Sequence, residues 1–397
     1  MKKLIIILYP FKFREFDWVR FEVDELKKNN DVIIFDFVTI LYPHFIKAYF
    51  VDKNIKKKIY IIKKLNLYKI KMDNLILKYG IENILILNFV KNDSLTALKI
   101  NYYIKKNLLK SINFFNPGIS IYNQKILKTN YSLIKKISIL FERKYETLQK
   151  IKGKFINFLV SILKLYPNFI LVAGSKCKKD IRNYTKKKQI KIIDGHSWDF
   201  SQILYKKKKY INSSNYAIYL DAPGPKFFSD SYLYGEKMPE TVKHTYPSLN
   251  NFFDYIENKL KLKVIISPHP KTKIKDRGGL FNGRRVIPGR THDLIKNSNL
   301  VITRNSTAVC FAAYFNKPII LFYTNETFNT VGYRSSFELA KSLRVKLINI
   351  NEFKKLNLKK ILKINKKIYK KYIYNFCTSK KNKLPNFKLI NNLINNR

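Results

Sequence analysis

The chain has 397 residues, enough for two domains with cores of their own. Hydrophobic residues make up 46% and include 29 Phe and 27 Tyr, a composition that excludes a disordered chain. Lys and Arg number 78 against 27 Asp and Glu, a formal charge of +51, which predicts an anionic partner such as nucleic acid, an acidic membrane face or a phosphorylated substrate. The basic residues are spread along the whole chain, as genomic codon bias would place them, and form no single stripe. Nucleic acid is therefore not the expected partner.

Cysteine usage and the length of the apolar runs indicate the cellular compartment of the protein. Cys177, Cys310 and Cys377 are far apart and odd in number, which indicates buried thiols in a reducing compartment and neither a disulfide framework nor a metal site. The first eight residues imitate a signal peptide, but no small-residue cleavage site follows, so we expect a first sheet strand there. No apolar run reaches the roughly 18 residues of a membrane span. We expect a cytoplasmic protein.

The first half alternates strand and helix patterns. A strand at Leu4–Tyr9, a helix at Asp17–Asn29 and a strand at Val32–Val38 form an opening βαβ unit. The turn after the first strand, Tyr9-Pro10-Phe11, has no glycine fingerprint, which argues against a dinucleotide-binding oxidoreductase. Further apolar runs that end in turns or small residues predict later strands at Asn83–Val90, Ile112–Phe115, Asn168–Ser175 and Ile190–Ile193.

One segment of the first half, Tyr122–Leu165, is long, rich in lysine and apolar at helical spacing. It predicts one or two amphipathic helices. These are either ordinary surface helices packed on their domain or a basic element that rests on anionic lipid.

A charged and then polar stretch, Tyr205–Asn215, separates the two halves. We therefore predict an N-terminal domain (1–205), a linker (206–215), a C-terminal domain (216–375) and a Lys- and Asn-rich tail (376–397). The second half opens with a strand at Tyr216–Leu220, a long irregular loop and a helix at Tyr246–Leu260. The predicted fold class is α/β, with two Rossmann-like domains of parallel sheet that face a cleft.

Two polar turns follow buried strands in the second half. Val264–Ile266 stops at Ser267-Pro268-His269-Pro270, where two prolines prevent a helix or a central strand from continuing. Leu300–Thr303 ends at Arg304-Asn305-Ser306-Thr307, before an apolar helix at Ala308–Phe315 and a strand at Ile319–Tyr323. Asn305 or Ser306 is the expected helix N-cap. Ligands of such sheets bind beyond the carboxyl ends of the strands, and both turns are predicted at that edge.

These motifs carry a family resemblance. SPHPK at 267–271, THDLIKNSNLVITRNSTAVCFAAYFNKPIIL at 291–321 and, more weakly, IIDGHSWD at 192–199 resemble glycosyltransferases of the two-domain GT-B type. They are similar to bacterial sialyl- and polysialyltransferases, mainly over residues 216–325. Capsule polysaccharide transferases and teichoic-acid glycerophosphotransferases share related patterns. The resemblance implies a sugar donor activated by a nucleotide, CMP among the candidates. The implied acceptor is a growing bacterial surface polysaccharide or a lipid-linked glycan, at the inner face of the membrane.

Glycosyl transfer gives a chemical reason for the residue types. The leaving nucleotide phosphate needs positive charge or hydrogen-bond donors where its charge develops. His269 is the expected donor and Lys271 adds a charge, while Ser306, Thr307 and the N–H groups behind them offer a helix N-terminus. The remaining residues of the predicted donor site belong to the same two turns: Ser267, Pro268, Pro270, Arg304 and Asn305. No Asp-x-Asp pair and no histidine spacing points to a metal, and no cofactor is implied.

The acceptor hydroxyl needs a base. In the sialyltransferases an acidic residue beside a glycine has this role, and Asp194-Gly195 resembles that arrangement, with Asp199 as the rival. The alternative for Asp194 is a turn cap. Arg284, Arg285 and Arg290 either clamp phosphate or carboxylate or are simply solvated.

Other functions stay open at this point. A sugar-nucleotide epimerase could use the same scaffold, although it would need several acidic residues in the cleft and this chain is poor in acids. A basic nucleic-acid-binding protein and a non-catalytic glycan-binding member of the fold are the further alternatives.

Overall fold

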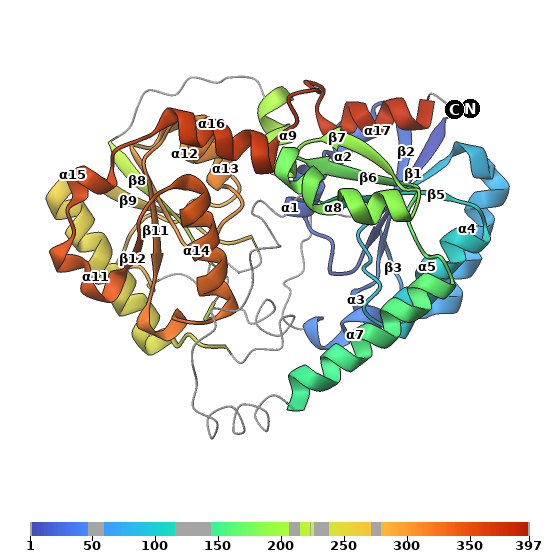
Figure 1. Ribbon diagram of the computed structural model, residues 1–397, viewed down its shortest axis with the longest axis horizontal. Helices are drawn as coiled ribbons and strands as arrows, with labels where there is room; N and C mark the ends of the chain where they lie inside the picture. Colours follow the sequence, from blue (N-terminus) through green and yellow to red (C-terminus); the bar gives the residue numbers. More distant parts are fainter. Residues whose placement is uncertain are drawn as a thin grey trace.

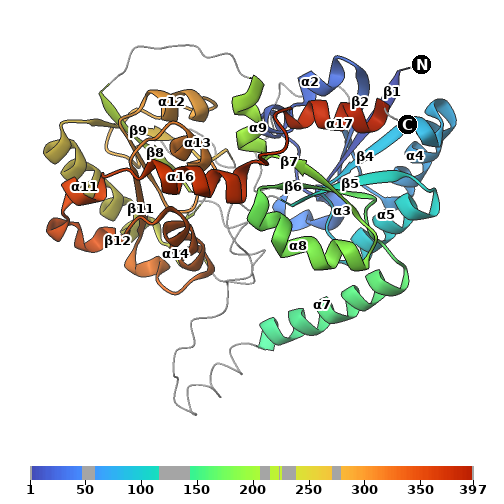
Figure 2. The same ribbon diagram turned by 45° about the horizontal axis from the view of Figure 1, so that its top comes forward.

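The computed structural model describes residues 2–46, 59–115, 144–205, 215–222, 224–225, 238–270 and 279–395. Most of the predicted linker (206–214), Lys271 and the first part of the predicted amphipathic segment (122–143) lie outside the described residues. Figures 1 and 2 show two α/β lobes side by side, each with a central sheet covered by helices.

The first lobe is built on a seven-stranded parallel sheet in the order β3-β2-β1-β4-β5-β6-β7. Its centre is fully buried, since Leu4 to Leu8 of β1 expose 0% of their surface. Strands covered on both faces read as continuous apolar runs, and this explains why β1 and β4 were predictable. The strands are β1 (Lys3–Tyr9), β2 (Asn30–Asp36), β3 (Ile59–Ile61), β4 (Ile84–Asn88), β5 (Lys110–Phe115), β6 (Phe169–Ala173) and β7 (Lys191–Gly195).

Helices cover both faces of this sheet (Figure 1). They are α1 (Glu15–Arg20), α2 (Val23–Lys27), α3 (Val38–Leu41), α4 (Leu65–Tyr79), α5 (Leu95–Lys106), α7 (Lys144–Ile162), α8 (Ser175–Lys187) and α9 (Trp198–Tyr205). None of the helices in the described parts of the chain is both long and apolar enough to cross a membrane.

The second lobe has a five-stranded parallel sheet in the order β12-β11-β10-β8-β9. Its strands are β8 (Tyr216–Leu220), β9 (Lys263–Ser267), β10 (Leu300–Thr303), β11 (Ile319–Tyr323) and β12 (Leu347–Asn349). Its helices are α11 (Val242–Leu260), α12 (Thr291–Asn297), α13 (Val309–Tyr314), α14 (Val331–Leu343), α15 (Leu358–Ile361) and α16 (Lys366–Tyr372). The prediction of an α/β fold with two parallel sheets is confirmed.

The C-terminal segment returns to the first lobe. Residues 373–377 form a π-helix after α16, and helix α17 (Asn386–Asn395) then packs against the first lobe (Figures 1 and 2). Phe387, Ile390 and Ile394 lie in one core cluster with Leu26 of α2. This part of the chain was predicted only as a Lys- and Asn-rich tail, so the helix is a finding of the structure.

The predicted first helix is two short helices, and α17 provides the reason. The chain breaks at Glu22, which has a left-handed backbone with φ 56°. The buried Glu22 carboxylate accepts a hydrogen bond from the backbone N–H of Phe387 at 2.9 Å, in the first turn of α17. A carboxylate at a helix N-terminus is stabilised by the helix dipole. This contact spans 365 residues of sequence, so no local pattern indicated it.

The two lobes share one hydrophobic core. It combines Cys177 of α8 and Phe200 of α9 with Cys310 of α13 and Phe376 of the π-helix. All three cysteines are buried and free, as predicted, and burial raises the pKa of the Cys177 thiol to about 12. This apolar contact holds the lobes together and thereby sets how their sheet edges face each other.

Candidate functional site

The carboxyl edge of the second sheet contains a change in strand order. The chain runs from β8 to β9 on one side and then crosses to β10 on the other side of β8. Ligands of doubly wound sheets bind in the crevice at such a point. The residues that follow the strands here are Asp221 after β8, Pro268 after β9, Arg304 after β10 and Thr324 after β11. The two predicted turns therefore lie at one edge, separated only by the end of β8.

The His269 turn is held to its own lobe at its first residue. Ser267 is buried, its hydroxyl lies 2.8 Å from the hydroxyl of Thr291 at the start of α12, and its carbonyl accepts from the Asp221 N–H at 3.0 Å. Pro268 is buried, whereas His269 and Pro270 are half-buried. Each proline fixes φ near −65°, so the turn has little freedom once Ser267 is anchored. His269 is thus presented at the sheet edge on a stiff segment.

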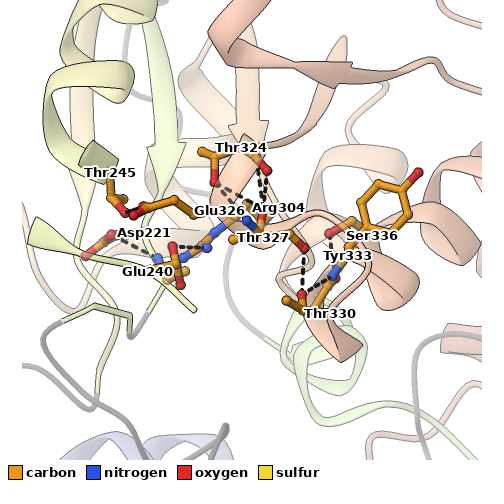
Figure 3. A network of polar contacts seen from close by, with 12 residues as sticks. Asp221, Glu240, Thr245, Arg304, Thr324, Glu326, Thr327, Thr330, Tyr333 and Ser336 are labelled. Atoms are coloured by element: carbon orange, nitrogen blue, oxygen red, sulfur yellow. Dashed lines mark hydrogen bonds and ion pairs between the residues drawn. The ribbon is translucent and has the colours of Figure 1, made fainter. Parts of the chain in front are cut away.

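Arg304 forms an ion pair that the sequence analysis did not foresee. Its Nη1 donates to Oε1 of Glu240, and the two side chains expose only 12% and 7% of their surface (Figure 3). Burial acts to lower the pKa of Arg304, but the Glu240 carboxylate outweighs it and holds this pKa above the ordinary value. Glu240 thus compensates the charge of Arg304 within the protein itself.

The second turn differs in detail from its prediction. The helix α13 begins at Val309 with Ala308 at the N-cap, so neither Asn305 nor Ser306 is the cap. Ser306 stabilises the turn, because its Oγ accepts a hydrogen bond from the Ala308 N–H at 3.3 Å. Asn305 and Thr307 are exposed. The helix α13 has only six residues, and the exposed side chains of the turn stand before it.

A threonine-rich network after β11 was missed. Thr324 and Thr327 cap each other, with Thr327 Oγ1 accepting from the Thr324 N–H at 2.9 Å and Thr324 Oγ1 from the Thr327 N–H at 3.3 Å (Figure 3). Glu326 accepts from the Thr241 N–H at 3.3 Å and from the Thr241 hydroxyl at 2.7 Å, at the start of α11. The N-terminus of α11 is therefore occupied by the protein's own carboxylate. The Thr-x-x-Thr spacing at 324–327 could have indicated this network, because a threonine at such a position is typical of a helix N-cap.

The three arginines between the turns are not equivalent. The Arg284 side chain is 7% exposed and pairs with Asp254 and with Glu257, the latter at 2.6 Å. Both carboxylates accept hydrogen bonds from its guanidinium. Arg285 is exposed, and Arg290 is 57% exposed with Asp293 4.0 Å away.

The two candidate bases lie on the first lobe in different surroundings. Asp194 of β7, an edge strand, is 25% exposed, and both its carboxylate oxygens accept from Lys178 Nζ at 2.8 and 2.9 Å. Asp199 is buried in the first turn of α9, beside Cys310 and Tyr372, whose pKa values are raised mainly by burial and to a smaller extent by Asp199. Asp199 thus belongs to the packed contact between the lobes, and Asp194 is the more accessible of the two.

His196, which lies between them, is fully buried. Its Nε2 is 2.9 Å from the Leu384 carbonyl and its Nδ1 is 2.6 Å from Thr378 Oγ1. A carbonyl only accepts, so Nε2 carries the hydrogen and Nδ1 accepts from the threonine. Burial lowers the pKa of His196 to about 4. It therefore stays neutral and joins the C-terminal segment to β7.

A further acid, Asp36, lies at the carboxyl edge of the first sheet. Its two oxygens accept from the backbone N–H groups of Phe13 at 2.9 Å and Val38 at 3.0 Å, and burial raises its pKa to about 6. Asp36 fixes the loop after β1, a role that was not predicted for it. Among the described residues, no three His, Cys, Asp or Glu side chains converge as metal ligands.

Comparisons with known proteins support the fold. No protein-family model and no curated sequence matches the chain. Two structures of the wall teichoic acid polymerase TagF resemble it with TM-scores of 0.53 and 0.51 at 12% identity, over 100% of this chain and 88% and 89% of TagF. UDP-GlcNAc 2-epimerase from Neisseria meningitidis, bound to UDP-GlcNAc, scores 0.49 at 12% identity over 100% of both chains, too low to support an argument. The chain thus has the two-lobed α/β fold of the GT-B type, as TagF does.

Proposed function

We propose that this protein is a glycosyltransferase that moves a sugar from a nucleotide-activated donor to a growing bacterial surface polysaccharide or a lipid-linked glycan. The observation that carries the proposal is the placement of the His269 turn and the 304–307 turn at one sheet edge, on either side of the β8 end. A nucleotide bound at this strand-order change would have its phosphates within reach of both turns. The fold shared with TagF is consistent with this assignment.

In the proposed reaction, His269 donates a hydrogen bond to the leaving phosphate, and Lys271 follows it in sequence as a further cation. The exposed side chains of Asn305 and Thr307, with Ser306 between them, hold the nucleotide by neutral hydrogen bonds. Since Arg304 is paired with Glu240, the charge on the phosphate is met by His269 and Lys271 in this scheme. We propose that the reaction needs no metal and that the donor is a substrate rather than a cofactor.

The acceptor base comes from the first lobe in this proposal. Asp194 is preferred over Asp199, because an acceptor hydroxyl can reach a carboxylate that is 25% exposed but not one in the core between the lobes. Lys178 donates to both oxygens of Asp194 and so holds the carboxylate in a fixed orientation. Arg285 and Arg290, which the protein leaves exposed, are the remaining candidates for a phosphate or carboxylate clamp.

We also propose that the protein works at an anionic membrane surface. Phe155, Phe158 and Ile162 on one face of α7 are 55%, 60% and 59% exposed, while Ile156 and Val160 on the other face are buried against Leu98. Lys152 and Lys154 are exposed beside the apolar face. Apolar side chains flanked by lysines suit the boundary between acyl chains and acidic headgroups. Such a position would bring the lobe close to a lipid-linked acceptor.

The deciding experiment is a thermal-shift panel with CMP-, CDP-, UDP-, GDP- and TDP-linked ligands, followed by an assay with the selected donor. One nucleotide should raise the melting temperature most, because a specific ligand stabilises the folded state by mass action. Transfer then appears as release of that nucleotide in the presence of a glycan acceptor. Conversion of the donor to an epimer without nucleotide release would favour the epimerase alternative. Absence of stabilisation by all five classes would refute a nucleotide-sugar site.

A further inference from the structure

A buried arginine of the first lobe contacts the His269 turn of the second. Nη1 of Arg14 donates to the carbonyl of Pro270 at 2.9 Å, between residues separated by 256 positions. Arg14 is only 4% exposed, so this bond is shielded from water. Hydrogen bonds that involve a charged group are stronger than neutral ones, and loss of a buried partner is costly. The contact is therefore a specific link between the lobes at the residue that directly follows His269.

The arginine is itself firmly held. Asp17 Oδ2 accepts from the Arg14 backbone N–H at 3.2 Å and from Arg14 Nε at 3.4 Å. The hydroxyl of Tyr9, the last residue of β1, donates to the other oxygen of Asp17 at 2.9 Å. Asp36, at the end of β2, fixes the preceding residue through the Phe13 N–H. Two central strands thus determine where the Arg14 guanidinium points.

The contact at the Pro270 carbonyl can determine the backbone conformation around His269. Ser267 anchors the beginning of the turn within the second lobe, through Thr291 and Asp221. Between the anchors lie two prolines, which lack N–H groups and restrict φ. With Ser267 held by one lobe and Pro270 by the other, the backbone on both sides of His269 is constrained. Movement of the lobes apart would release only the Pro270 end.

We infer that Arg14 is a positioning residue for His269, which places the His269 side chain correctly only when the two lobes are together. The inference rests on the proposed role of His269 in transfer. Arg14 would act through the backbone of the turn and would not touch the donor.

The test uses full-length protein with Arg14→Gln and Arg14→Lys, and with Arg20→Lys as the matched control. Arg20 is the last residue of α1, the helix whose N-cap is Arg14, and lies over the Phe16 ring, within the first lobe. The chain has five histidines, so the imidazole signals can be resolved by NMR, and His269→Gln assigns one of them to His269. Steady-state kinetics and the Kd of the selected nucleotide are measured on the same proteins.

Arg14→Gln should shift the His269 signal and lower kcat by about 10- to 100-fold, since displacing a catalytic group by about 1 Å has effects of this size. The nucleotide Kd should stay near the wild-type value. Arg14→Lys keeps the charge and the packed stem but cannot bond Asp17 and Pro270 together, so it should restore kcat only in part. Arg20→Lys should change neither signal nor kcat.

Two results would overturn the inference. One is an unchanged His269 signal in Arg14→Gln and, should that variant fold poorly, in Arg14→Lys. The other is a raised nucleotide Kd with unchanged kcat, which would make Arg14 a donor-binding residue. If the signal shifts but wild-type protein transfers no sugar, the proposed function fails while the link between the lobes stands.

Discussion

Arg304 and Glu240 form a nearly buried ion pair at the centre of the carboxyl edge of the second sheet. Arg304 follows β10, beside the strand-order change, and Glu240 precedes α11. A cation that sequence reasoning assigned to the donor is thereby used to join two loops of the lobe. We therefore expect the ion pair to contribute to the free energy of unfolding, which can be measured without an assay of sugar transfer.

Glu240→Gln should destabilise the protein by about 3 kcal/mol, because it leaves the guanidinium of Arg304 buried without its compensating charge. Equilibrium unfolding in urea measures the change. The double variant Arg304→Met with Glu240→Leu should be closer to wild type than Glu240→Gln, since it removes both buried charges. A single variant as stable as wild type would show that Arg304 does not depend on Glu240 for charge compensation.

His269→Ala should reduce kcat by about 10²-fold or more if His269 stabilises the leaving phosphate. His244→Ala is the matched control, because His244 is exposed on α11. Initial rates of nucleotide release measure the effect, and circular dichroism checks the fold. Equal rates for the two variants would remove His269 from the mechanism.

Asp194→Asn should lower kcat by about 10²-fold, as expected when a general base is lost. The free energy of unfolding should change by less than about 1 kcal/mol, because partly exposed ion pairs such as Lys178–Asp194 contribute little. Kinetics and unfolding together separate the chemical role from the structural one. A variant that keeps full activity would assign Asp194 to its ion pair alone.

Asp36 should make stability depend on pH in an unusual direction. Burial raises its folded pKa from 3.8 to about 6, so the folded state binds a proton more tightly than the unfolded state does. This group therefore costs stability above pH 6, and the cost disappears as the pH falls towards 3.8. The full change is about 3 kcal/mol for this shift. Wild type should gain stability relative to Asp36→Asn between pH 7 and pH 4.5, as measured by urea unfolding. A constant difference would contradict the raised pKa.

The exposed face of α7 should bind anionic vesicles. Replacing Phe155, Phe158 and Ile162 by Ser should reduce co-sedimentation with anionic vesicles, while folding stays intact because these side chains are exposed. High salt should release wild-type protein, since exposed charges are screened within about 8 Å at physiological ionic strength. Leu77→Ser is the control, as Leu77 is 84% exposed on α4. Charge reversal of Lys135, Lys136 and Lys144 tests the basic part of the segment. Equal binding to neutral and anionic vesicles would contradict the proposal and attribute the high positive charge to codon bias.

The strands and the edge they share could be read from the sequence, because the signal is local. Val264–Ile266 and Leu300–Thr303 are apolar runs that end in prolines or polar residues, and parallel strands in one sheet end at the same edge. The ion-pair partners of the arginines could not be predicted from the sequence. The partners of Arg284 lie 27 and 30 residues away, and that of Arg304 lies 64 away.

The sequence by itself determined the alternation of strand and helix, the division into two α/β halves and the turns that follow the strands, since each depends on residues close together along the chain. Only the tertiary structure decided that Glu22 interrupts a helix to cap α17, that Glu240 neutralises Arg304 and that Arg14 reaches Pro270. Those contacts depend on how complete elements pack across the sheets and between the lobes. Many side chains of the right charge could make such contacts, and only the packed backbone selects which of them meet.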